Sequence, residues 1–121
     1  MVKILIVEDS LFERKAIINL LKKGNYTNVI EASDGYEGVK KYKEERPDLL
    51  LLDLRLPGMM SGFDVFREIK KINPFIKCII ISIIRKEGTI KEALELGVKD
   101  YITKPVTEEK LVPIVKKVVG E

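Results

Sequence analysis

Acidic and basic side chains follow several short apolar runs of this sequence, where they could bind a cation or a phosphate group. Glu8 and Asp9 come after the run KILIV, Asp53 ends the run LLLLD, and Lys104 comes shortly after VKDYI. Hard cations such as Mg²⁺ prefer carboxylate oxygens as ligands, and a phosphoryl group pairs well with an ammonium group. These residue types indicate a site for a divalent cation and a phosphoryl group, provided that the fold brings them together.

Asp53 needs an explanation because it ends a run of four leucines that has the character of a buried strand. An ionised carboxylate is costly to bury unless another group pairs with it. Asp53 is therefore either a turn residue at the rim of the core, or a carboxylate whose charge is used. The residue alone does not decide between the two interpretations.

The absence of histidine narrows the chemistry further. It excludes Ser-His-Asp triads, histidine metal sites and phosphohistidine carriers. Carboxylates must then carry any phosphate chemistry. The single cysteine, Cys78, lies within an apolar run and is interpreted as a small buried hydrophobic residue.

The composition predicts one compact domain over residues 1–121, with 45% hydrophobic and 34% charged residues. The net charge is only +3 and the two signs are interleaved, which argues against direct nucleic-acid binding. No apolar run approaches the roughly 20 residues that span a bilayer. The chain begins directly with a strand-like segment and no signal-peptide pattern, so we expect a cytoplasmic protein without membrane contact.

Apolar runs alternate along the whole chain with amphipathic segments. The runs predict strands at 3–7, 28–32, 49–53, 77–82 and 98–102. The amphipathic segments predict helices at 11–23, 36–45, 63–72, 89–96 and 108–119, the last of them containing Pro113, which could kink it. Strict alternation is typical of parallel strands joined by crossover helices. The predicted fold is therefore α/β, a doubly wound five-stranded parallel sheet with helices on both faces.

In such an open sheet, ligands bind beyond the carboxyl ends of the strands. Glu8, Asp9, Asp53, Ser82 and Lys104 all stand at or just after these ends. Because the carboxyl ends of parallel strands meet at one edge, the five side chains are expected to lie close together.

Each of these residues also has a simpler interpretation. Asp9 could belong to a helix start, since Ser10 and Glu13 have the spacing of a capping box. Lys104 and Pro105 could form an ordinary turn, and the other residues could be solvated or bonded to the backbone. The coincidence of all of them at one edge favours a shared site.

These motifs resemble those of the receiver domain of the two-component response regulator family, in particular its single-domain chemotaxis regulators. The matching pieces are the acidic pair in IVEDS, the aspartate in LLLLDLRLPG, the serine in IIIS, and DYITKP. The resemblance covers essentially the entire chain. It implies a flavodoxin-like sheet with strand order 2-1-3-4-5.

The resemblance also implies roles for the site residues. Asp53 would accept a phosphoryl group from a sensor histidine kinase or a phosphotransfer protein. Glu8, Asp9 and Asp53, with the backbone carbonyl of Arg55, would bind Mg²⁺ as cofactor. Lys104 would contact the phosphoryl oxygens. The protein would be a phosphoacceptor with slow self-dephosphorylation rather than an enzyme.

A conformational switch is implied as well. Ser82 would move to bond the phosphoryl group, Tyr101 would turn inward when it does, and the Lys104–Pro105 bond would be cis. The fourth helix, fifth strand and fifth helix would form the output face for a downstream protein. The resemblance is compatible with a monomer or a phosphorylation-dependent dimer.

Two segments depart from the family pattern. The loop PGMMSG at 57–62 is one residue longer and lacks the acidic residue often found before its glycine. Ile83 follows Ser82 where the family usually has a small residue. This apolar bulk should exclude the attacking water, so we expect slow hydrolysis of the phosphorylated form.

Three alternatives remain at this point. A phosphohydrolase of the haloacid dehalogenase type also uses an aspartate nucleophile at a strand end, but it requires a second aspartate where this chain has Arg55. The chain could instead be the receiver piece of a longer DNA-binding regulator. It could also be an adaptor that works without phosphorylation.

Overall fold

Strands and helices alternate strictly in the computed structural model, which describes all residues 1–121. The strands are β1 Ile4–Val7, β2 Val29–Ala32, β3 Leu49–Leu52, β4 Cys78–Ser82 and β5 Asp100–Thr103. The helices are α1 Leu11–Lys23, α2 Gly35–Glu45, α3 Gly62–Ile72, α4 Glu87–Leu96 and α5 Glu108–Val119. Every predicted element is present, and the bounds differ from the prediction only at the ends. None of the helices has the length and apolarity needed to cross a membrane.

The five strands form one parallel sheet in the order β2-β1-β3-β4-β5. This confirms the predicted fold class and strand order. Successive residues of a strand point to opposite faces of the sheet. Leu50 and Leu52 accordingly belong to one buried cluster, and Leu49 and Leu51 to the other. The run of four leucines is explained by a central strand that is covered on both sides.

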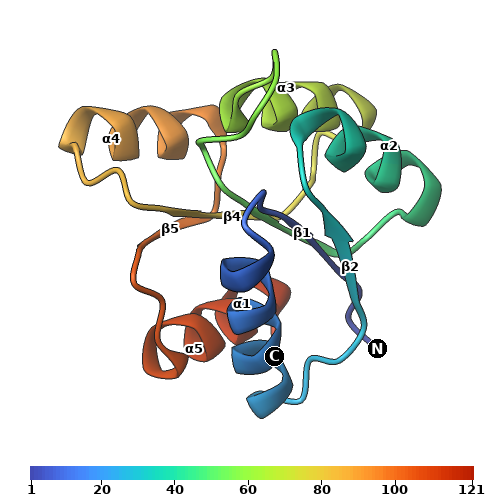
Figure 1. Cartoon of the computed structure of the whole chain (residues 1–121), viewed down its shortest axis with the longest axis vertical. Coiled ribbons are helices and arrows are strands. Elements are labelled where there is room, and N and C mark those ends of the chain that lie inside the picture. Colours follow the sequence, from blue (N-terminus) through green and yellow to red (C-terminus); the bar gives the residue numbers. More distant parts are fainter.

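Helices cover the two faces unequally, as Figure 1 shows. α1 and α5 lie together on one face, and α2, α3 and α4 lie on the other. Helix α5 buries Leu111 and Val115, which are four residues apart and therefore on one side of the helix. Pro113 is exposed on the opposite side, and α5 continues through it to Val119.

Side-chain caps fix the starts of three helices. Ser10, Asp34 and Ser61 each accept a hydrogen bond from the N–H three residues further on. In α3 the capping box is complete, since Asp64 also accepts the N–H of Ser61 at 3.0 Å. This cap ends the loop 57–62 and fixes where α3 begins after β3.

Gly62, the first residue of α3, lies directly against the chain that follows β3. Its N–H donates to the carbonyl of Leu54 at 2.9 Å. A Cβ atom at this position would collide with main-chain atoms of Asp53 and Leu54. Glycine is therefore required here for the close approach of α3 to the segment that carries Asp53.

We predict that Gly62→Ala lowers the free energy of unfolding by about 1 to 3 kcal/mol, because rigid backbone atoms must move to admit the methyl group. Gly88→Ala in α4 is the matched control, since a Cβ there meets nothing within 4 Å. It should leave stability unchanged or raise it by about 0.4 to 1 kcal/mol. Urea denaturation of both variants measures the difference. Equal effects at the two glycines would contradict the packing explanation.

Candidate functional site

The carboxyl edge of the sheet brings together residues from three separate strand ends. Lys104, just after β5, places its Nζ 2.6 Å from Glu8 Oε1 and 2.9 Å from Asp53 Oδ2. The side chains of Glu8, Asp53 and Lys104 are 3%, 8% and 10% exposed. A buried ammonium group therefore pairs with two buried carboxylates, as the sequence predicts from their positions.

Asp53 is both a residue at the end of a strand and a paired charge. Its Oδ1 accepts the N–H of Arg55 at 3.1 Å, while Oδ2 faces Lys104. Both carboxylate oxygens thus have a hydrogen-bond donor, and no buried side-chain polar atom of the chain lacks a partner. These contacts stabilise the carboxylate at the end of an apolar strand.

The surroundings raise the pKa of both Glu8 and Lys104. This rise favours the neutral form of Glu8 and the charged form of Lys104. Burial raises the pKa of Glu8 to about 7, although the hydrogen bonds from Lys104 and Ser10 oppose this rise. Burial lowers the pKa of Lys104, but its bonds to Glu8 and Asp53 outweigh this and raise the pKa overall. The ammonium group stays charged at neutral pH. A further cation beside Glu8 would stabilise the charged form of its carboxylate.

Glu8, Asp9 and Asp53 could supply such a cation with ligands. One carboxylate oxygen from each lies within 4.8 Å of the other two, and Asp9 is exposed while the other two are buried. Opposite ligands of an octahedral Mg²⁺ lie about 4.2 Å apart. The three oxygens fit a small hard cation after a slight side-chain adjustment, and Asp9 leaves the group open to solvent.

Arg14 holds the β1–α1 loop that carries two of these carboxylates. Its guanidinium donates to the carbonyl of Glu8 at 2.7 Å and to Glu31 Oε1, on β2, at 2.8 Å. Lys15 Nζ lies 2.8 Å from the other oxygen of Glu31. This support could not be predicted from the sequence, because nothing in the spacing of Arg14 and Glu31 indicates that α1 and β2 meet here.

Ser82 and Tyr101 both contact the main chain of Ile84, in the loop before α4. Ser82 is buried at the end of β4, and its Oγ accepts the N–H of Ile84 at 3.1 Å. The Tyr101 hydroxyl donates to the carbonyl of Ile84 at 2.7 Å. Burial, together with the charge of Asp53, raises the pKa of Tyr101. The loop before α4 is thus tied to the same edge as Asp53.

The structure adds one carboxylate that the sequence analysis considered only as part of a helix start. Glu13 Oε1 lies 3.1 Å from Lys104 Nζ. The Lys104–Pro105 peptide bond is cis, as expected. The carbonyl of Arg55 follows Asp53 directly at this edge, and its role as a metal ligand stays a prediction.

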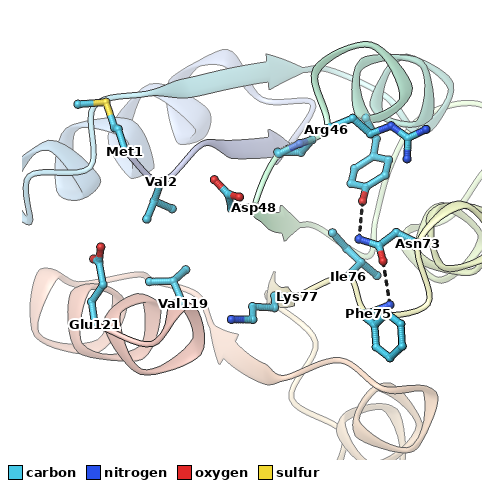
Figure 2. Close-up of a pocket in the computed structure, with 12 residues that line it drawn as sticks. Met1, Val2, Arg46, Asp48, Asn73, Phe75, Ile76, Lys77, Val119 and Glu121 are labelled. Atoms are coloured by element: carbon cyan, nitrogen blue, oxygen red, sulfur yellow. Dashed lines mark hydrogen bonds between the residues drawn. The ribbon is translucent and has the colours of Figure 1, made fainter.

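A second hollow, of about 650 Å³, lies at the opposite end of the sheet and contains none of these residues. Figure 2 shows its lining, with Asp48 at the start of β3 and Asn73 after α3. Asn73 bonds the Tyr42 hydroxyl and the N–H of Phe75, and Asp48 accepts the N–H of Lys3. Asp48 and Asn73 are thus bonded within the protein, and the acidic cluster with its lysine lies at the carboxyl edge, which remains the candidate site.

Comparison with known proteins identifies the family of the chain. Residues 4–116 match the model of the response regulator receiver domain. The chain is 37% identical to the chemotaxis protein CheY of Thermotoga maritima over 96% of each chain, and 37% identical to the protein CcdB of Bacillus subtilis over 99% of each.

Solved structures agree with these relatives. A chain of the CheX–CheY–BeF3–Mg complex from Borrelia burgdorferi superposes with a TM-score of 0.90 at 32% identity, covering 97% of this chain and 88% of that one. A response regulator receiver domain protein from Clostridium thermocellum gives 0.91 at 30% identity, covering 99% and 95%.

A doubly wound parallel sheet with an acidic group and a lysine at its carboxyl edge is the architecture of a receiver. The chain belongs to the response regulator receiver domain family and is a CheY-like receiver domain of two-component response regulators. Members of this family are signalling proteins that accept a phosphoryl group. The comparisons do not favour the phosphohydrolase, DNA-binding or adaptor alternatives.

The contacts of Glu31 predict how stability depends on pH. Hydrogen bonds from Lys15 and Arg14 lower its pKa from the ordinary 4.5. A lowered folded-state pKa contributes stability above the unfolded pKa, and this contribution is lost as pH falls through the folded value. We expect Glu31→Gln to cost about 1 kcal/mol at neutral pH and progressively less below pH 4.5.

Urea denaturation at several pH values measures this dependence. Glu44→Gln is the control, because Glu44 is exposed and forms none of the ion pairs of the structure. A cost for Glu31→Gln that persists unchanged in acid would show that the side chain acts through packing rather than charge.

Proposed function

We propose that Asp53 is the phosphoryl acceptor of this receiver and that a histidine kinase or a phosphotransfer protein is the donor. The observation that carries the proposal is the contact of Asp53 Oδ2 with Lys104 Nζ at 2.9 Å, beside the carboxylates of Glu8 and Asp9. Glu8 after β1 is bonded in a similar way, by Lys104 and the N–H of Ser10. Asp53 differs in that it ends β3, the middle strand of the five, with Lys104 on one carboxylate oxygen and the N–H of Arg55 on the other.

The transfer needs positioning and charge neutralisation more than covalent help from the protein. An oxygen of Asp53 forms a bond to phosphorus as the bond from phosphorus to the donor nitrogen breaks. Lys104 is placed to neutralise charge on the phosphoryl oxygens. Glu8, Asp9 and Asp53, with the carbonyl of Arg55, would hold Mg²⁺. When bound, the ion supplies further neutralisation of the same oxygens.

Ser82 and Tyr101 would transmit the change to the surface. Ser82 would move to donate its O–H to a phosphoryl oxygen and so release the N–H of Ile84 that it now accepts, which loosens the loop that Tyr101 also holds. A phosphoryl group adds charge and acceptor oxygens, which is enough to shift a two-state loop. The face formed by α4, β5 and α5 would then present a different surface to a downstream protein.

Incubation with acetyl phosphate and Mg²⁺, followed by intact mass, tests the acceptor. We expect the wild-type chain to gain one phosphoryl group only when Mg²⁺ is present, and Asp53→Asn to gain none. Asp34→Asn is the control, since asparagine caps a helix as well as aspartate does and Asp34 only caps α2. Phosphorylation that survives in Asp53→Asn would place the acceptor elsewhere.

A slow loss of the phosphoryl group is the second part of the proposal. Ile83 directly follows Ser82 and is 53% exposed, so its side chain lies at the surface beside the end of β4 rather than inside the core. Apolar bulk at this position limits the approach of the attacking water. The phosphorylated protein should therefore persist for minutes or longer.

We expect Ile83→Ala to speed the hydrolysis about two- to tenfold, because removing the bulk admits water; a barrier change near 1 kcal/mol gives such a factor. Leu94→Ala is the matched control, as Leu94 is 48% exposed on α4 and away from the strand ends. The decay of the phosphorylated mass after removal of the donor gives both rates. A wild-type half-life of seconds, or equal rates in the two variants, would contradict this role of Ile83.

A further inference from the structure

Lys104 has a third carboxylate partner that the proposed chemistry does not use. Its Nζ lies 2.6 Å from Glu8, 2.9 Å from Asp53 and 3.1 Å from Glu13. An ammonium group carries three N–H donors. With three carboxylates around it, Lys104 has no donor left for a phosphoryl oxygen. One of the three must give way when a phosphoryl donor arrives, while Asp53 is still a carboxylate.

Glu13 is the partner that can leave. Its side chain is 45% exposed, whereas those of Glu8 and Asp53 are 3% and 8% exposed. Before the bond to phosphorus forms, Glu8 and Asp53 are both carboxylates, and taking the lysine from either would leave a buried charge without its partner, which is far more costly than returning an exposed carboxylate to water. When Lys104 turns to a phosphoryl oxygen, Glu13 is therefore the carboxylate that it releases.

The start of α1 directs Glu13 toward Lys104. Ser10 caps the helix by accepting the N–H of Glu13 at 3.2 Å. In a complete capping box, Glu13 would accept the N–H of Ser10 in return. Here that N–H donates to Glu8 Oε2 at 3.1 Å instead, so the Glu13 carboxylate is free to reach the lysine. Glu13 therefore has the sequence position of a capping residue but contacts Lys104 in the site.

The other two capped helices show the ordinary use of the same position. Asp64 of α3 accepts the N–H of Ser61 at 3.0 Å. Glu37 of α2 accepts the N–H of Ser33 at 2.7 Å. Neither acid contacts Lys104. Glu37 is therefore a matched control for Glu13, with the same residue type at the same position of a helix.

Glu13 also lines a groove that reaches Lys104. A groove of about 230 Å³ beside α1 is lined by Glu13 and Lys104, together with Phe12, Ala16 and Pro105. Glu13 is not one of the three carboxylates that could hold a cation, so Lys104 is the cation that pairs with its charge. An anionic phosphate compound entering from this side meets an extra negative charge.

We propose that Glu13 is a positioning residue that competes with the phosphoryl group for Lys104 and slows phosphorylation by small anionic donors. The proposal rests on Asp53 being the acceptor. In the step concerned, an oxygen of Asp53 bonds to phosphorus, the bond from phosphorus to the acetate oxygen of acetyl phosphate breaks, and acetate leaves. Lys104 must turn from Glu13 to the phosphoryl oxygens as this happens.

The rate of phosphorylation by acetyl phosphate with Mg²⁺, followed by intact mass, tests this on the whole chain. At low salt, Glu13→Gln should react about three to ten times faster than wild type, as removal of a repelling charge beside a site predicts. Glu37→Gln should react at the wild-type rate. The advantage of Glu13→Gln should shrink at high salt, and it should be smaller with phosphoramidate, which carries less negative charge at neutral pH.

These dependences on salt and donor charge separate an electrostatic role from a merely structural one. Equal rates for wild type and Glu13→Gln at low salt would overturn the proposal. An acceleration that ignores salt and donor charge would overturn it as well.

Thermal unfolding tests the ion pair between Glu13 and Lys104 in the unphosphorylated protein. Glu13→Gln should lower the Tm by about 1 to 3 °C in the wild-type background and leave it unchanged in a Lys104→Met background. If Lys104→Met does not fold, Glu8→Gln/Lys104→Met, which also removes the buried carboxylate, is the background. Equal losses in both backgrounds would overturn the proposal.

The phosphorylation rate and the thermal measurement together distinguish a failure of the Asp53 proposal from a failure of the Glu13 proposal. A wild-type chain that acetyl phosphate does not phosphorylate, with the thermal coupling intact, would count against Asp53 as acceptor, while Glu13 would still hold Lys104. A chain phosphorylated on Asp53 without any effect of Glu13→Gln would leave the acceptor in place and remove Glu13 from the mechanism.

Discussion

The ammonium group of Lys104, buried between the carboxylates of Glu8 and Asp53, is the interaction on which the rest of the site depends. Two carboxylates at the end of an apolar sheet would repel each other and lose hydration without it. The lysine makes the arrangement stable in the unphosphorylated protein. It is also the group best placed to bind an added phosphoryl group, so stability and signalling compete for the same cation.

The fold fixes the positions of Glu8, Asp53 and Lys104 closely. β1, β3 and β5 end at one edge, and each is fixed by packing on both faces of the sheet. Gly62 lets α3 approach the segment after β3, and Arg14 ties the loop after β1 to the neighbouring strand. The site residues themselves lie in short connections. Their positions are set by close packing beneath them: Glu8, Asp53 and Ser82 are buried, whereas Asp9 and Glu13 face solvent substantially.

The three capped helix starts share one local sequence pattern, but their acidic residues make different contacts. Glu37 and Asp64 use their carboxylates within their own helix starts. Glu13 occupies the same position of α1 but contacts Lys104, because Glu8 has taken the N–H that would otherwise have held it. A small local exchange of hydrogen bonds thereby links the first helix to the phosphoryl site. The link is electrostatic, so salt and donor charge influence it.

The sequence alone determined the alternation of elements, the double-sided burial of LLLL at 49–52 and the gathering of Glu8, Asp53 and Lys104 at one edge, because these follow from periodicity and from the direction of parallel strands. It also indicated the family through its motifs. The tertiary structure decided the contacts that join distant elements, such as Arg14 with Glu31 and Glu13 with Lys104. Local patterns carry no information about which side chains meet after the chain has folded, so a cap and a contact with the site look the same until Lys104, after β5, reaches the start of α1.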